Sequence, residues 1–158
     1  MVRDLARQGF VMDVAHLAEP GFWEAVDVFE GPLISSHTGF RRFCDTPRNL
    51  SDKQVKALMA RKGVVGVSVN PEMLSPDQQA DITGVFGQFD WLVQTHGVEG
   101  AALGSDFGGF EGETLGFEHY GRLDQLANLF AQHGYPEPAI SKIMGENWYR
   151  LYTAKLPP

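Results

Sequence analysis

The stretch Gly63-Val64-Val65-Gly66-Val67-Ser68-Val69 is apolar at almost every position and only seven residues long. A short run without alternation of polar and apolar residues is typical of a strand that is buried on both faces of a parallel sheet. Runs of the same character span residues 9–16, 32–37 and 100–106. The sequence therefore predicts a parallel sheet of four strands.

Segments of helical periodicity lie between and after these runs. Ser51-Asp52-Lys53-Gln54 and Ser75-Pro76-Asp77-Gln78 both have the spacing of a capping box, which predicts that a helix begins at each. After Ser75, apolar residues recur at three- and four-residue steps until His96-Gly97, which is typical of a helix end. Similar patterns over 123–130 and 140–151 predict that the chain ends in helices.

The alternation of strands and helices predicts an α/β fold, and no linker or low-complexity stretch divides the chain. We therefore interpret residues 1–158 as one structural unit. A closed (β/α)₈ barrel takes about 250 residues, and four strands cannot close one. The sheet is therefore either open or half of a barrel.

The charge balance argues against several classes of partner. The chain has 13 Lys and Arg residues against 20 Asp and Glu residues, a net charge of −7. Nucleic acid and anionic membranes are bound by basic surfaces, so neither is expected as a partner.

Cys44 is the single cysteine and the N-terminus lacks a signal-peptide pattern. We therefore expect no disulfide, no membrane segment within this chain and a cytoplasmic location.

Polar residues stand at the ends of three predicted strands: His16, His37 and Asp106. The carboxyl ends of parallel strands form the ligand face of a sheet, so we expect these side chains to converge. Imidazole and carboxylate groups are zinc ligands, and two histidines with one aspartate would suffice in number for a catalytic site. The alternative for each histidine is a hydrogen-bonded structural role.

Four motifs follow one another along the chain. They are Met12-Asp13-Val14-Ala15-His16, Ile34-Ser35-Ser36-His37 followed by Pro47-Arg48-Asn49, Gly104-Ser105-Asp106-Phe107, and Gly145-Glu146-Asn147-Trp148-Tyr149-Arg150. In their order and approximate spacing, these motifs resemble the renal (membrane) dipeptidase family, a family of zinc-dependent dipeptidases. The resemblance covers nearly the whole chain and implies strands 5–8 of a TIM-type (β/α)₈ barrel with C-terminal helices, that is, the C-terminal half-barrel.

The resemblance also implies a chemistry. The family hydrolyses dipeptides with two zinc ions, bridged by a glutamate and by a water or hydroxide that attacks the peptide carbonyl. Carried over by motif, His16 and His37 would bind one zinc. Asp106 would lie beside the other zinc and act as the catalytic proton carrier, and Arg48 would bind the substrate's terminal carboxylate.

The sequence departs from the family in what it lacks. The His-x-Asp motif of the family's first strand and its bridging glutamate have no counterpart, so this chain supports at most one zinc well. Gly108 stands where the family usually has an aspartate. The loop Gly108–Gly116 follows the fourth strand, and a mobile lid and a plain surface loop are equally compatible with it.

Two functional hypotheses follow, and a third is weaker. The first is a metallodipeptidase that is incomplete in this segment and forms a homo-oligomer or pairs with a missing N-terminal half, because a half-barrel exposes its sheet edges. The second is a non-catalytic, truncated paralogue that acts as a structural or interaction module. The third, an open α/β ligand-binding domain, requires that the four motifs agree by coincidence.

Overall fold

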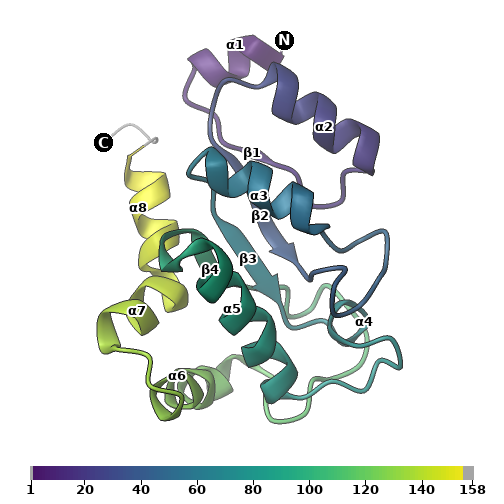
Figure 1. Ribbon diagram of the computed structural model, residues 1–158, viewed down its shortest axis with the longest axis vertical. Helices are drawn as coiled ribbons and strands as arrows, with labels where there is room; N and C mark the ends of the chain where they lie inside the picture. The colour runs from purple at the N-terminus through teal and green to yellow at the C-terminus, as the bar shows by residue number, and fades with distance from the viewer. Residues whose placement is uncertain (1, 155–158) are drawn as a thin grey trace.

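Four parallel strands form one sheet in the order β1-β2-β3-β4, as the apolar runs predicted (Figure 1). The computed structural model describes residues 2–154. The first strand is much shorter than its apolar run. The strands are β1 (Met12–Asp13), β2 (Leu33–Thr38), β3 (Val65–Ser68) and β4 (Ala101–Ser105).

Helices follow every strand, which confirms the α/β class. In Figure 1, α3 and α5 lie in front of the sheet and α8 lies at its side. Among residues 2–154, no helix combines the length and apolar character needed to cross a membrane. The helices are α1 (Val2–Arg7), α2 (Glu19–Val28), α3 (Asp52–Ala60), α4 (Pro71–Leu74), α5 (Ile82–His96), α6 (Leu123–Gln132), α7 (Glu137–Ser141) and α8 (Asn147–Thr153), with short turns η1 (Val98–Gly100), η2 (Tyr120–Arg122) and η3 (Lys142–Glu146).

One of the two predicted helix starts is correct. The capping box of Ser51 and Gln54 begins α3, since the Ser51 hydroxyl accepts from the Gln54 N–H and Gln54 Oε1 accepts from the Ser51 N–H. The start at Ser75 is wrong. The Ser75 hydroxyl donates to Asp77 Oδ1 at 2.5 Å, which forms a local turn, and α5 begins only at Ile82, with Asp81 as its N-cap.

The two faces of the sheet are covered differently. Side chains that alternate along the strands point to opposite faces, so neighbours such as Leu33 and Ile34 belong to separate clusters. The face with Leu33 packs against the main core, which includes the fully buried Phe22, Phe89 and Phe130 of the helices. The opposite face has a small cluster, Ile34, Val64, Ala102 and Leu151, to which α8 contributes the leucine.

The neighbouring strands approach closely at two glycines. A Cβ atom at Gly66 would overlap the carbonyl oxygen of Ser36 in β2 and would lie 2.9 Å from the Cα of Gly104 in β4. A Cβ atom at Gly104 would overlap the same Ser36 oxygen. Three strands therefore meet backbone to backbone at one point, which only residues without a side chain permit.

We predict that Gly66→Ala lowers the free energy of unfolding by about 1–3 kcal/mol, because the added methyl group meets backbone atoms that cannot rotate away. Gly87→Ala is the matched control. Gly87 lies within α5 and nothing lies within 4 Å of the place its Cβ would take. Alanine there should raise stability by about 0.5–1 kcal/mol. Urea unfolding measures both, and an unchanged midpoint for Gly66→Ala would contradict the close approach.

Candidate active site

The ends of three strands bring His16, His37 and Asp106 to one cavity of about 780 Å³, which Arg48 also lines. His16 lies three residues beyond β1, His37 lies near the end of β2, and Asp106 directly follows β4. All four residues singled out from the sequence therefore share one cavity at the carboxyl ends of the strands. This is the edge of the sheet at which convergence was expected.

The two histidines are in direct contact. Their Nε2 atoms are 2.9 Å apart, and their rings meet edge to face with centroids 4.9 Å apart. Asp106 Oδ2 lies 3.8 Å from His37 Nε2, and Arg48 Nη2 lies 3.0 Å from His16 Nε2. His16 Nε2 is thus the point on which a second imidazole and a guanidinium converge.

The backbone at the strand ends is unusual. His16, Ser105 and Asp106 have φ angles of 67°, 47° and 77°, in the left-handed region that residues with side chains rarely adopt. Such residues cost of order 1–3 kcal/mol each and cluster at functional sites. Here they turn the chain sharply as it leaves β1 and β4, and so aim side chains into the cavity.

Asp13 ties the end of β1 to β2. Its Oδ1 accepts hydrogen bonds of 3.0 Å from the backbone N–H groups of Ala15 and Ser36, which immediately precede His16 and His37. Asp13 therefore has a structural role. It fixes the two histidine-bearing segments relative to each other.

Arg48 is held in place by its neighbour Asn49. The Asn49 side chain is buried, accepts from the Gly39 N–H at 3.1 Å, and donates to the carbonyl oxygens of Cys44 and Met73 at 2.7 and 2.8 Å. These bonds tie the loop after β2 to the start of the chain segment beyond β3. The hydrogen bonds of Asn49 therefore fix the position of the loop that carries Arg48.

The pKa of His16 is lowered from its ordinary value of 6.5. Burial is the largest cause, followed by the positive charge of Arg48 and by His37, while Asp106 and Asp13 act in the opposite direction. The lowered pKa favours the neutral ring, and a neutral imidazole is the form that binds metals. The contribution of His16 to folding stability is present above pH 6.5 and is lost as the pH falls through the folded-state pKa.

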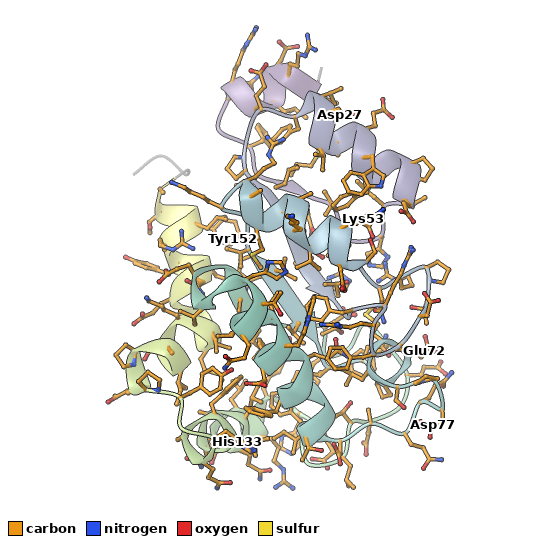
Figure 2. The ribbon with its side chains drawn as sticks, viewed as in Figure 1. Asp27, Lys53, Glu72, Asp77, His133 and Tyr152 are labelled. Carbon is orange, nitrogen blue, oxygen red and sulfur yellow. The ribbon has the colours of Figure 1, made fainter. Side chains whose placement is uncertain are left out.

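Sequence reasoning missed part of the cavity wall. Glu72 of α4 and Glu111 carry carboxylates at the cavity, and neither carboxylate makes a hydrogen bond or ion pair with the described residues. Figure 2 shows Glu72 at the end of the sheet to which the strands point, away from Tyr152 of α8. No residue pattern marks these glutamates, because the turns that place them are set by the fold.

The loop Gly108–Gly116, which follows β4, forms part of the cavity wall. Gly108, Gly109 and Phe110 line it together with Glu111. The far end of the loop is anchored, since Thr114 Oγ1 donates to the Val69 carbonyl oxygen at 2.6 Å. The segment that faces the cavity therefore lies between two fixed points, the end of β4 and Thr114.

The two histidine nitrogens are close enough to bind one metal ion together, but the cavity lacks a complete set of ligands. The separation of 2.9 Å between the histidine nitrogens is shorter than two zinc–nitrogen bonds of about 2.0–2.1 Å end to end, so one ion can contact both. Within residues 2–154, however, no group of three or more His, Cys, Asp and Glu side chains is arranged to hold a metal ion. The three residues share a cavity without forming a complete ligand set.

We predict that Arg48→Gln raises the pKa of His16 toward 6.5, because removal of the guanidinium removes a charge that opposes protonation. NMR titration of the histidine ring protons measures this. Arg42→Gln is the control, since Arg42 lies over the ring of Trp91 and is not among the groups that shift His16. Equal effects of the two substitutions would contradict the assigned contact.

Comparison with known proteins places the chain in a family. The sequence profile of the membrane dipeptidase family (peptidase family M19) matches residues 1–155. An uncharacterised protein in the pqqA 5′ region of Klebsiella pneumoniae is 32% identical over an alignment of 149 residues, and the match covers 89% of this chain and 53% of that protein. The dipeptidase tcpJ of Claviceps purpurea is 28% identical over 96% of this chain and 36% of its own length.

Solved structures share the fold. A metallopeptidase of Rhodobacter sphaeroides, crystallised with a phosphinate mimic of the dipeptide L-Ala-D-Ala, superposes with a TM-score of 0.91 at 28% identity, over 98% of this chain and 45% of that one. A dipeptidase described as a metallopeptidase of the same family superposes with a TM-score of 0.90 at 28% identity, over 98% and 46%. The chain thus spans about half the length of these relatives. The profile match over residues 1–155 shows that the chain belongs to the membrane dipeptidase family, peptidase family M19.

Proposed function

We propose that residues 1–158 form the C-terminal half, strands 5–8, of a (β/α)₈ barrel that hydrolyses dipeptides with zinc. The observation that carries the proposal is the meeting of His16 and His37, with nitrogens 2.9 Å apart, in a cavity that also contains Arg48 and Asp106. Family membership and the parallel sheet support the same conclusion.

Each residue has a proposed role. His16 and His37 would hold one zinc. Bound zinc would lower the pKa of a water molecule and polarise the peptide carbonyl. Asp106 carries the proton that passes from the attacking water to the leaving amine, a role that suits a carboxylate at the cavity wall.

Arg48 binds the terminal carboxylate of the dipeptide, because a guanidinium can donate to both carboxylate oxygens at once. In the present structure Arg48 instead donates to the His16 nitrogen that the proposed zinc would use. One lone pair cannot serve both. Zinc binding at His16 would therefore release the guanidinium toward a substrate carboxylate, which links the two proposed binding events.

The dipeptide substrate is proposed from two sources. The Rhodobacter sphaeroides relative was crystallised with a mimic of L-Ala-D-Ala. The cavity of this chain also offers Arg48 for a carboxylate. Glu72 and Glu111, whose carboxylates make no hydrogen bond or ion pair within residues 2–154, suit an ammonium group, so the cavity matches the two charged ends of a dipeptide.

The proposed unit is incomplete. The family's His-x-Asp motif and bridging glutamate have no counterpart in residues 1–158. A second zinc would therefore need ligands from outside this segment, and we propose that one zinc at most binds here. For the same reason we propose a single partial domain that self-associates or pairs with an N-terminal half.

The zinc site is tested by elemental analysis of protein purified without a histidine tag. We expect about one zinc per chain, lost in His16→Ala and His37→Ala, because each variant removes one of the two nitrogen ligands. His133→Ala is the control, since His133 ends α6 and does not line the cavity. Figure 2 shows it well apart from Glu72, which does line the cavity. Zinc retained in both cavity variants would place the metal elsewhere.

The activity is tested by release of alanine from L-Ala-D-Ala in the presence of zinc. Release that disappears in Asp106→Asn, with the fold intact by circular dichroism, supports the dipeptidase. A folded chain that neither binds zinc nor releases alanine supports the alternative, a non-catalytic paralogue that acts as an interaction module.

The half-barrel is tested by light scattering. We expect a dimer or larger assembly, because β1 and β4 are edge strands of the sheet and edge strands readily pair with other chains. A monodisperse monomer would contradict the half-barrel interpretation and would favour an open sheet that is complete in itself.

A further inference from the structure

A second, smaller cavity lies beside the main one, between the end of β2 and the first turns of α2 and α3. Its volume is about 230 Å³, and Ser35 of β2, Gln54 of α3 and Arg48 of the loop that joins them line it. We call this cavity the side pocket. Arg48 also lines the main cavity, so one arginine side chain is common to both.

Ser35 places a hydroxyl without a partner in the wall of the side pocket. The residue is fully buried, and its Oγ makes no hydrogen bond within residues 2–154. Burial of a hydroxyl is unfavourable unless a hydrogen bond replaces the one it made to water. A ligand with an acceptor atom in the side pocket would supply that bond.

Two other side chains of the side pocket have donor groups to spare. Gln54 is buried and its Oε1 accepts from Ser51, whereas its amide N–H groups bond to none of the described residues. Arg48 makes one hydrogen bond, to His16 Nε2 at 3.0 Å, and no ion pair in the part of the chain that the structure describes. The groups of the wall that still need a partner are therefore mainly donors.

The N-terminus of α2 adds donors of the same kind. Ala18, its N-cap, and Glu19, its first residue, both line the side pocket. An alanine side chain cannot accept a hydrogen bond, so the first N–H groups of α2 have no side-chain cap. The start of a helix also carries a partial positive charge. These features favour an anion whose oxygen atoms accept hydrogen bonds.

The charged side chains of the wall leave a positive excess. Two arginines, Arg41 and Arg48, and one carboxylate, Glu19, line the side pocket. Glu19 Oε2 already pairs with Arg41 Nη1 at 3.1 Å. Arg48 is therefore the cation without a carboxylate partner among the described residues, and no carboxylate of the wall is free to hold an ammonium group.

The rest of the wall is apolar and the space is small. Val14, Leu17 and Leu50 line the side pocket. Phosphate and sulfate direct oxygen atoms to every side, so an apolar wall suits them poorly, whereas it suits a short hydrocarbon chain. A water molecule takes about 30 Å³ in the liquid, so the volume corresponds to roughly eight waters, or to a molecule of about six non-hydrogen atoms.

We propose that the side pocket binds a small aliphatic carboxylate, with its oxygen atoms at Arg48, Ser35 and Gln54 and its hydrocarbon end against the apolar part of the wall. A guanidinium can donate to both carboxylate oxygens at once. This binding depends neither on zinc nor on dipeptide hydrolysis. Because Arg48 also lines the main cavity, a carboxylate in the side pocket acts on that cavity through this one side chain.

The first measurement is a ¹H–¹⁵N NMR titration of the whole chain with sodium butyrate at constant ionic strength. The side-chain amide of Gln54 reports on the side pocket and the N–H of Gly109 reports on the main cavity, since each residue lines only that one. We expect a saturable shift of the Gln54 amide. A saturable shift of Gly109 without one of Gln54 would place the anion in the main cavity and overturn the proposal.

Two related molecules test the chemistry of the ligand without any substitution. Butanol keeps the hydrocarbon chain and lacks the charge, so it should not shift the Gln54 amide at the concentrations at which butyrate does. 2-Aminobutyrate adds an ammonium group, and it should bind more weakly than butyrate because Glu19 is engaged by Arg41. Equal shifts with butanol and butyrate would overturn the carboxylate as the recognised group.

The second measurement compares Ser35→Ala with Thr46→Val. Thr46 Oγ1 is also buried without a partner among the described residues, but Thr46 lines only the main cavity. We expect Ser35→Ala to weaken butyrate binding about tenfold, through loss of a hydrogen bond to a charged group, and Thr46→Val to leave it unchanged. Equal affinity of Ser35→Ala and the unsubstituted chain would overturn the proposal. Urea unfolding checks that both variants fold.

Discussion

The arrangement of the sheet depends on the close approach of three backbones, where the carbonyl oxygen of Ser36 packs against Gly66 and Gly104. This contact draws β2 toward β4 across β3, and so sets how the carboxyl ends of the strands face one another. His37 follows Ser36 directly, and Asp106 lies two residues beyond Gly104. A constraint inside the sheet therefore determines the geometry of a cavity at its edge.

The cavity combines groups that compete for one another. His37 Nε2 and Arg48 Nη2 lie 2.9 and 3.0 Å from the same atom, His16 Nε2, and Asp106 Oδ2 lies 3.8 Å from His37 Nε2. Asp13 and Asn49 hold the surrounding segments through backbone hydrogen bonds rather than through contacts with the cavity groups. The framework around the cavity is thus fixed by backbone hydrogen bonds, while the polar groups within the cavity lie close enough to compete for the same atoms.

Much of the fold could be predicted from hydrophobic pattern, because strands buried on both faces and amphipathic helices leave clear traces in sequence. The failures were local. Ser75 has the spacing of a capping box, but its hydroxyl donates to Asp77 Oδ1 in a local turn. The sequence pattern does not indicate whether a capping box or such a turn forms. The helix α2 was expected only from the alternation of strands and helices. Its start could not be placed, since its N-cap, Ala18, makes no side-chain hydrogen bond.

The candidate site could be predicted only where topology determines it. His16, His37 and Asp106 follow strand ends, so a parallel sheet brings them to one edge whatever the intervening loops do. The approach of Arg48 to His16 and the positions of Glu72 and Glu111 depend on turns of irregular backbone, which have no periodic signature. The contact of Ser36 Oγ with His37 Nδ1 depends on side-chain rotamers, which no sequence pattern predicts.

The left-handed residues His16, Ser105 and Asp106 have a consequence for the history of such a chain. Selection for thermal stability alone would favour glycine at these positions, because glycine adopts such angles without penalty. A histidine and an aspartate at these positions lower the stability of the fold and place an imidazole and a carboxylate in the cavity. Glycine at these positions would raise the stability of the fold and remove the imidazole of His16 and the carboxylate of Asp106 from the cavity, so stability and the polar character of the cavity change in opposite directions.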